Sequence, residues 1–258
     1  MRKLIEIADL YAGYNNQIVL SNISITVFEN DFIGIIGPNG GGKTTLLKAV
    51  TGLIKPFSGS ITYYNEGSVS KGFIGYLPQI NQFDKKFPIN VTEVVLSGLL
   101  SRKKLISGYS RIEKESAIAL LDQMHISHLA KKPVGELSGG QMQRVFLCRA
   151  LIAEPSVLIL DEPDTYVDNR FESELYDILA KLNQKLAIMV VSHDIGIISS
   201  YVKTIACINR ELHYHQGREI TPEILQVYNC PIDLIAHGPV PHRVLQDHEQ
   251  NEHDHEHH

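Results

Sequence analysis

The chain has 258 residues, of which 43% are hydrophobic and 21% are charged, and its formal net charge is −5. This length and composition predict one large or two small globular domains that bury enough apolar surface to fold unaided. The mild acidity disfavours non-specific nucleic-acid binding, which requires a basic face.

The opening stretch, MRKLIEIADLYAGY, interrupts its apolar run with Glu6 and Asp9, so we expect no signal peptide. The longest apolar runs, such as LAIMVV, are far shorter than the roughly 20 residues that a membrane-spanning helix needs. The cysteines Cys148, Cys207 and Cys230 lie far apart without a CxxC pair, which suits a reducing compartment and disfavours structural zinc. We therefore expect a cytoplasmic protein whose cysteines are small buried hydrophobes.

Short strands are predicted in the first part of the chain. LIEIADL is strand-like, and NISITVF alternates Ile23, Ile25 and Val27 with polar residues. DFIGIIG is typical of a strand buried on both faces, and it leads into a glycine-rich loop. A helix is expected from Thr44 toward Gly52, followed by strands in GSITYY and GFIGYL.

The pattern becomes helical from about Gln82 to Ala153, with no convincing strand. This stretch predicts an inserted helical lobe. Within it, the segment QMQRVFLCRALIA predicts a helix with one apolar face, made by Val145, Cys148, Leu151 and Ile152.

Two buried strands follow, in VLILDEP and LAIMVVSHD. Between them a predicted helix places Phe171, Leu175, Ile178 and Leu182 on one face. Strands that alternate with helices predict an α/β fold with a parallel sheet, which binds ligands at the carboxyl ends of its strands. The periodicity weakens after about Gly217.

The glycine-rich stretch GPNGGGKTT matches the pattern GxxxxGK[ST] from Gly37 to Thr44. Glycines let a backbone wrap around phosphates, while successive amides and a helix N-terminus direct positive dipole at them. In this pattern Lys43 reaches the β- and γ-phosphates and the Thr44 hydroxyl is a Mg²⁺ ligand. A plain glycine-rich turn is disfavoured, because a strand precedes this loop and a helix follows it. The ATP-binding residues predicted here are Gly37, Pro38, Asn39, Gly40, Gly41, Gly42, Lys43, Thr44 and Thr45.

A pair of acidic residues ends the strand in VLILDEP. Asp161 is placed to hold Mg²⁺ through water, and Glu162 to orient and deprotonate an attacking water as a general base. The alternative is that both acids only favour the start of the next helix through its dipole. The phosphate loop makes the catalytic interpretation stronger.

The stretch ELSGGQMQR predicts a second anion-binding helix end, which a single ATP site would not need. It resembles the signature loop of ABC ATPases, and the resemblance covers about residues 3–217. In that family two ATPase domains sandwich two nucleotides, and the signature loop of one closes on the γ-phosphate held by the other. The resemblance therefore implies a second copy of this chain as partner. It adds to the ATP-binding residues Ser138, Gly139, Gly140 and Gln141.

The same resemblance implies an α/β fold with a mostly parallel core sheet, a small antiparallel β subdomain and an inserted helical subdomain at about 82–153. It places an ATPase domain over 1–220 and leaves a C-terminal extension over 221–258. The cofactors it implies are ATP and Mg²⁺.

The remaining motifs fall in the family's order. Tyr14 resembles the aromatic that stacks on adenine, with Tyr11 as a nearby rival. Gln79, in GYLPQ, resembles the glutamine that senses Mg²⁺ and the water. His193, in VVSHD, resembles the switch histidine that bonds the γ-phosphate. Asp168, which ends DTYVD, stands where the family has its dimer-contact loop.

Two departures from the family pattern stand out. Gly41 replaces a commoner small side chain in the phosphate loop. Tyr166 and Val167 replace a smaller, more regular pair in the dimer-contact loop. Both leave the chemistry intact and concern details of the dimer contact.

The stretch FPINVTEVVLSGL, residues 87–99, resembles the corresponding part of zinc, manganese and iron importer ATPases more than that of sugar or amino-acid importers. An ordinary helix start, with Pro88 before it and Thr92 as a cap, is the alternative. The resemblance implies integral-membrane permease subunits and an extracytoplasmic metal-binding protein as partners. It implies a peripheral location at the cytoplasmic face of the inner membrane, and no nucleic-acid partner.

The C-terminal tail alternates histidines with acidic residues. Neutral imidazole is a good ligand for Zn²⁺, Ni²⁺ or Cu²⁺. The possible metal ligands are His253, His255, His257 and His258. A solvated polar tail is the alternative.

The favoured hypothesis is an ATPase subunit that powers uptake of a transition metal, zinc or manganese. One alternative keeps the transporter and changes the cargo to an iron chelate. The other is a soluble ABC ATPase acting on nucleic acid or ribosomes. That class usually has a second ATPase domain, a coiled-coil insertion or a basic extension, and none of these is visible in the sequence.

Overall fold

In the computed structural model, the chain divides into two compact units, Met1–Glu219 and Ile220–His258. In the second unit β10 (Leu234–Ile235) pairs antiparallel with β11 (His242–Arg243). No helix among the described residues is both long and apolar enough to span a bilayer. The residues that the structure describes are 1–64, 72–79, 88–100, 108–163, 169–216, 234–235 and 242–243.

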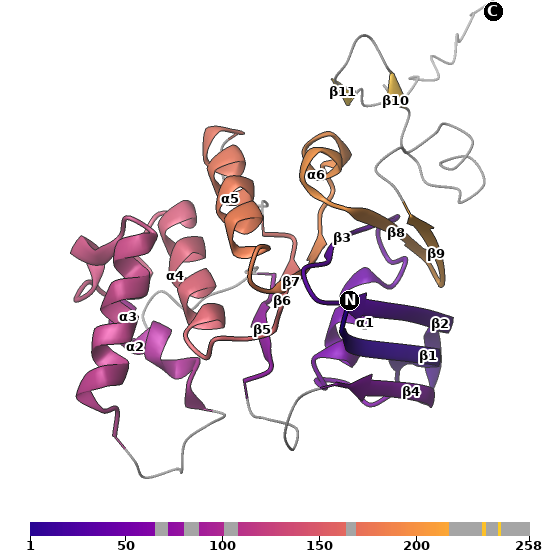
Figure 1. Ribbon diagram of the computed structural model, residues 1–258, viewed down its shortest axis with the longest axis horizontal. Coiled ribbons are helices and arrows are strands. Elements are labelled where there is room, and N and C mark those ends of the chain that lie inside the picture. The colour runs from indigo at the N-terminus through magenta and orange to yellow at the C-terminus, as the bar shows by residue number, and fades with distance from the viewer. Residues whose placement is uncertain are drawn as a thin grey trace, which may run out of the picture. The chain divides into compact units, whose positions relative to one another are not determined.

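A six-stranded sheet in the order β5-β6-β7-β3-β8-β9 lies at the centre of the first unit (Figure 1). The strands from β5 to β8 are parallel, and β9 runs antiparallel to β8. Every residue of β3, β6 and β7 is buried, as expected for parallel strands that are covered on both faces. The predicted parallel sheet is confirmed. Its strands are β3 (Phe32–Ile36), β5 (Ile74–Leu77), β6 (Val157–Asp161), β7 (Ala187–Val191), β8 (Thr204–Asn209) and β9 (Glu211–Gln216).

A second, antiparallel sheet has the order β2-β1-β4. Its strands are β1 (Lys3–Tyr14), β2 (Gln17–Phe28) and β4 (Ser58–Tyr63). The predicted alternation in β2 is confirmed, because Ile23, Ile25 and Val27 are all buried.

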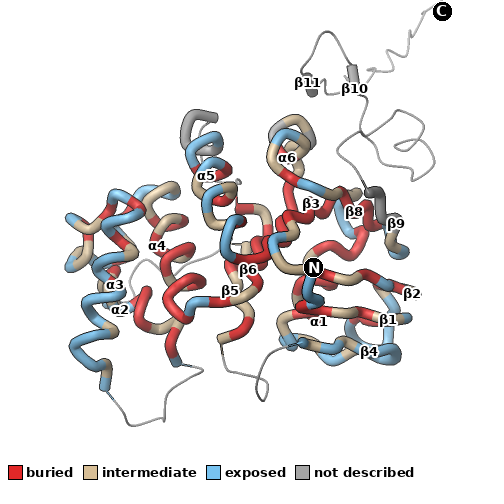
Figure 2. The backbone as a smooth tube through the Cα atoms, in the orientation of Figure 1, coloured by how far each residue is buried: buried red, intermediate tan, exposed pale blue. Residues whose placement is uncertain are grey.

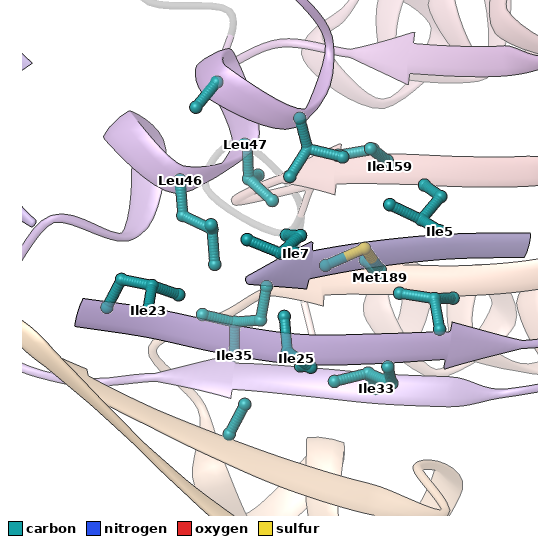
Figure 3. Packing of buried hydrophobic residues seen from close by; sticks show 14 of the residues in the cluster. Ile5, Ile7, Ile23, Ile25, Ile33, Ile35, Leu46, Leu47, Ile159 and Met189 are labelled. Carbon is teal, nitrogen blue, oxygen red and sulfur yellow. The ribbon is translucent and has the colours of Figure 1, made fainter. Parts of the chain in front are cut away.

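The hydrophobic core fills the space between the two sheets and α1 (Lys43–Val50). Figure 3 shows Ile7 and Ile25 of the antiparallel sheet packed with Ile35 and Met189 of the central sheet and with Leu47 of α1. The other face of the central sheet carries α5 (Asn169–Leu182) and α6 (Ile195–Tyr201) (Figure 1). This core fixes α1 at the end of β3, where the glycine-rich loop joins them.

The helical lobe contains α2 (Val91–Ser97), α3 (Arg111–Gln123) and α4 (Gly139–Leu151), and no strand lies among its described residues. Short 3-10 turns at Ser127–Leu129 and Val134–Glu136 lead into α4. Figure 2 shows α4 largely buried and α3 mostly exposed. The apolar face predicted for α4 is buried as expected, at Val145, Cys148, Leu151 and Ile152. Burial raises the pKa of the Cys148 thiol to about 12, which keeps it protonated.

The alternative given for residues 87–99, an ordinary helix start capped by Thr92, has the wrong cap. Asn90, not Thr92, caps the helix: its side chain accepts a hydrogen bond from the Glu93 amide at 2.9 Å, and Glu93 bonds back to the Asn90 amide. The Thr92 hydroxyl instead donates to the Ala130 carbonyl at 2.9 Å. Asparagine followed three positions later by glutamate is a capping box, and its reciprocal bonds outweigh a lone threonine inside the first turn.

The buried face of α5 is rotated slightly from the prediction. Leu175 is buried as expected, but Ile178 and Leu182 are only half-buried. Tyr176 and Leu179 take the central positions against the sheet, and the Tyr176 ring stacks on Tyr201 of α6 at 5.4 Å between centroids. The ring contact with α6 brings Tyr176 inward, and spacing alone does not predict it.

Candidate active site

The glycine-rich loop leaves the end of β3 and enters α1 at Lys43. Its backbone is left-handed at Gly37, with φ of 147°, and at Gly42, with φ of 105°. A Cβ at Gly37 would lie 2.0 Å from the carbonyl oxygen of Ile208, so only glycine fits there. Gly42 is the N-cap of α1, and no side-chain hydrogen bond caps this helix start.

Lys43 is 5% exposed and turns back along its own loop. Its ammonium donates to the carbonyl oxygens of Gly37 at 2.8 Å and Pro38 at 3.1 Å. The ammonium is thus bonded to carbonyl oxygens of its own loop, and its contact with the β- and γ-phosphates stays a prediction.

The structure offers an explanation for the unusual Gly41. A Cβ at this position would lie 2.8 Å from the Ile208 carbonyl oxygen and 3.0 Å from that of Pro38. The Arg210 amide also donates to the Gly41 carbonyl at 2.9 Å. The end of β8 therefore packs directly on this loop and leaves no room for a side chain unless the loop shifts.

Asp161 ends β6 and is 1% exposed. Its Oδ1 accepts a hydrogen bond from the Thr44 hydroxyl at 3.1 Å, whereas its Oδ2 is buried without a hydrogen-bond partner. Burial raises the pKa of this carboxyl, and the Thr44 bond opposes that rise. A carboxylate oxygen without a partner beside a hydroxyl is a donor set of the kind that Mg²⁺ prefers. Thr44 and Asp161 therefore fit the predicted cation.

Glu162 lies between two other predicted residues. Its Oε1 is 2.6 Å from His193 Nε2, and its Oε2 accepts from the Gln79 amide. Because an ionised carboxylate only accepts, His193 must carry a proton on Nε2 in this arrangement. The structure thus brings Gln79, Glu162 and His193 together from the ends of β5, β6 and β7.

Backbone geometry fixes this group. Glu162 has a left-handed φ of 51°, and its amide donates to the Val191 carbonyl of β7 at 3.0 Å. A non-glycine residue held in this conformation costs roughly 1–3 kcal/mol and points to a functional constraint. After β7, the Ser192 hydroxyl accepts from the Asp194 amide at 3.0 Å, which holds the turn that carries His193.

Tyr14 ends β1 and is 40% exposed. The Lys48 ammonium of α1 lies 5.9 Å from its ring centroid. The rival Tyr11 is half-buried within β1, at a position that pairs with Ser58 of β4. Tyr14 is therefore the more accessible ring for stacking.

Ser138 lies away from this group. It is the exposed N-cap of α4, where its hydroxyl accepts from the Gln141 amide at 3.4 Å and its amide donates to Gln141 Oε1 at 3.1 Å. The opposite end of α4 packs on the central sheet, since a Cβ at Gly75 of β5 would lie 2.3 Å from the Ala150 carbonyl oxygen. Ser138 is thus a helix length, roughly 15–20 Å, from that contact. Figure 1 shows α4 and α1 well apart.

Three groups of predicted residues lie outside the described residues. These are Asp168 with its neighbours Tyr166 and Val167, Phe87, and the tail histidines His253, His255, His257 and His258.

Sequence reasoning missed two strands and one further residue beside the site. It did not predict β8 and β9, although the end of β8 supports the glycine-rich loop through Ile208 and Arg210. The apolar run TIACIN was the available signal. It also passed over Tyr76 of β5, whose pKa is raised by burial and by the nearby charge of Asp161.

Comparison with known proteins agrees with the fold. The family described as ABC transporter matches residues 20–165. A probable metal transport system ATP-binding protein of Thermotoga maritima is 37% identical over 92% of this chain and 94% of its own length. A zinc uptake system ATP-binding protein of Listeria monocytogenes is 36% identical over 85% of this chain and 92% of its own.

A solved structure of the ADP conformation of an ATP-binding cassette from an ABC transporter superposes with a TM-score of 0.74. It is 25% identical, and the match covers 89% of this chain and 99% of that one.

Proposed function

Because the chain belongs to the ABC transporter family, we propose that it is the ATP-hydrolysing subunit of a transporter that takes up a transition metal, zinc or manganese. One observation carries the hydrolytic part. The phosphate loop, Asp161 and the group of Glu162, Gln79 and His193 meet at the carboxyl ends of adjacent parallel strands. Residues 1–220 form the ATPase domain, with the helical subdomain at about 82–153 and a C-terminal extension from 221 to 258.

In the proposed reaction the water oxygen attacks the γ-phosphorus, and the bond from that phosphorus to the bridging oxygen of ADP breaks. Glu162 accepts the proton that the water loses. Lys43 and the loop amides hold the phosphates, and His193 bonds the γ-phosphate once it turns from Glu162. Thr44, Asp161 and Gln79 would hold Mg²⁺, which neutralises phosphate charge when bound. Tyr14 stacks on the adenine.

A second copy completes each site. Ser138, Gly139, Gly140 and Gln141 of one copy close on the nucleotide held by the other, with Asp168 at the contact between them. The position of Ser138 supports this proposal, because it is exposed at the start of α4, roughly 15–20 Å along the helix from the contact of α4 with β5.

Residues 87–99 face the membrane-embedded permease, and the protein works at the cytoplasmic face of the inner membrane. An extracytoplasmic metal-binding protein delivers the cargo, and no nucleic acid takes part.

The charge introduced by Phe87→Asp should weaken docking to the permease, because it would be buried without a partner. Co-purification with the permease should fall while ATP hydrolysis by the isolated chain persists. Equal loss of hydrolysis in the isolated chain would show that this stretch is core.

The identity of the transported cargo is proposed from the names of related proteins. Proteins named as zinc uptake or zinc import ATP-binding proteins are 36% identical over most of this chain. Uptake of ⁶⁵Zn²⁺ and ⁵⁴Mn²⁺ into vesicles with the assembled complex should depend on ATP. An iron chelate should not be taken up. Uptake of the chelate without either metal would replace this proposal with its alternative.

The tail is a second, separable proposal: its histidines bind transition metal in the reduced cytosol. We expect zinc binding by several exchangeable ligand sets, weakening below about pH 6.5, where imidazole protonates. Truncation after Val244 should remove most zinc binding and leave ATP hydrolysis intact. Replacing the four predicted tail ligands by glutamine is the matched control, because it keeps the tail's length. Calorimetric zinc titrations that are identical for all three proteins would make the tail a solvated coil.

A further inference from the structure

The Arg144 side chain joins three helices. It lies on α4, its Nη1 donates to the Met124 carbonyl at the C-terminal end of α3 at 2.9 Å, and its Nη2 contacts Glu174 Oε2 of α5 at 2.7 Å. The first bond stays within the helical lobe. The second crosses from the lobe to a helix that packs on the central sheet.

The burial of this pair is asymmetric. The Arg144 side chain is 13% exposed, whereas that of Glu174 is 51% exposed. A guanidinium is a planar fork with fixed donor directions, so two partners on two helices define how α4 is placed relative to both. By contrast, the Arg111–Glu115 pair has the same 2.7 Å separation but lies within α3, with side chains 91% and 61% exposed.

The joined helices lead to the two segments that the proposed dimer uses. α4 begins directly after Ser138, and Arg144 lies in its first two turns. α5 begins at Asn169, directly after the segment that contains Asp168, and Glu174 also lies near its start. The Arg144–Glu174 contact is a hydrogen-bonded link between these two helix starts.

We propose that Arg144 and Glu174 are positioning residues that set the signature loop, Ser138–Gln141, at the angle needed to close on the nucleotide of the second copy. The contacts described above join the two residues to α3, α4 and α5. In this proposal their effect is on the neighbour's site. This inference rests on the proposed two-copy site.

The first test uses the full-length chain with the change Glu174→Lys, which sets two cations against each other. Hydrolysis should fall by roughly 10-fold to 10²-fold, since misplacing a reacting group by about 1 Å has effects of this size. ATP binding to the single chain and the thermal midpoint should stay close to wild type. Glu115→Lys, which breaks the intrahelical pair, is the matched control and should change none of these.

A mixing experiment separates positioning from a general folding defect. Glu174→Lys leaves the phosphate loop unchanged and misplaces the signature loop. Lys43→Ala damages the phosphate loop and leaves the signature loop unchanged. Alone, Lys43→Ala should be inactive or nearly so, and Glu174→Lys should show the roughly 10-fold to 10²-fold loss expected above. An equimolar mixture should recover about a quarter of wild-type activity, because half of randomly formed dimers are mixed and each contains one complete site.

Mixing Ser138→Arg with Lys43→Ala tests the two-copy site itself. If this mixture recovers activity and the Glu174→Lys mixture does not, the pair acts within its own chain and the inference is wrong. If the Ser138→Arg mixture stays inactive, the two-copy site fails and the inference fails with it. Recovery in both mixtures supports the positioning role, and unchanged hydrolysis by Glu174→Lys alone overturns it.

Discussion

Two helix starts carry the proposed chemistry, and they are built in opposite ways. α1 begins inside the core: its glycine-rich loop is held by β3 and β8, Lys43 is buried, and Thr44 bonds Asp161 of a neighbouring strand. α4 begins at the surface: Ser138 is exposed and its hydrogen bonds go to Gln141 of its own first turn. The first start lies beside other predicted site residues, and the second is satisfied by its own first turn.

The difference separates two kinds of preorganisation. Around α1 the residues that bind and react are fixed against each other by strands, so binding of ATP needs one chain. Around α4 only the helix start is fixed, and in the proposed dimer it becomes part of a site when a second copy supplies the nucleotide. A substitution at the start of α1 should therefore impair the ATP site of the chain that carries it. A substitution at the start of α4 should impair the ATP site of the second copy.

The largest effect is expected at the α1 side. Glu162→Gln removes the proton acceptor and keeps the shape, so hydrolysis should fall by a factor on the order of 10²–10⁴. ATP binding should persist, because Lys43 and the loop amides are untouched. Phosphate release and nucleotide binding, measured on the same preparation, check both parts. Hydrolysis close to wild type would remove Glu162 from its assigned role.

Ser138→Arg should have the next largest effect. Its bulk and charge should keep the signature loop from closing, and losing one such transition-state contact reduces rates by a factor on the order of 10². The variant's own affinity for ATP, measured with a fluorescent analogue, should match wild type. A variant that lost ATP binding would place Ser138 in its own chain's site and contradict the proposed separation of the two helix starts.

Gly37→Ala tests how tightly the α1 start is built. The new Cβ would meet the Ile208 carbonyl oxygen at 2.0 Å, and the backbone would remain left-handed. Gly52→Ala is the matched control, because its φ of 74° is also left-handed but nothing lies within 4 Å of the added Cβ. The control should lose roughly 1–2 kcal/mol of unfolding free energy, and Gly37→Ala should lose more. Equal losses in chemical denaturation would mean that β8 does not hold the loop.

Ser138→Ala gives the smallest effect. It removes an N-cap and should cost about 1 kcal/mol of unfolding free energy, as should Asn90→Ala, which removes the cap of α2. Only Ser138→Ala should also slow hydrolysis, because its hydroxyl serves the neighbouring site. If the two variants hydrolyse ATP equally, the Ser138 hydroxyl is a cap and nothing more.

The sequence was most informative where one residue type is required by local chemistry. The glycines before Lys43, and Asp161 and Glu162 after an apolar strand, could be assigned because backbone room and charge at a strand end depend on neighbours in the chain. Such features recur with fixed spacing, and the structure brings these residues together as predicted.

Features set by packing between distant elements were not predictable in this way. The buried face of α5 includes Tyr176, whose ring stacks on Tyr201 of α6, and β9 is an edge strand whose polar residues break the apolar pattern. The contact of Arg144 with Glu174 depends on how α4 packs against α5. Spacing along the chain carries no record of that packing.

The central claim is that the two helix starts meet only between copies, and it can be tested by sedimentation of the Glu162→Gln chain. Without ATP the chain should sediment as a monomer, and with ATP and Mg²⁺ as a dimer, because each nucleotide bridges one α1 start and one α4 start. Adding Ser138→Arg to that chain should return it to a monomer in ATP. A chain that stays monomeric with saturating ATP, or that dimerises equally well without it, would contradict the account.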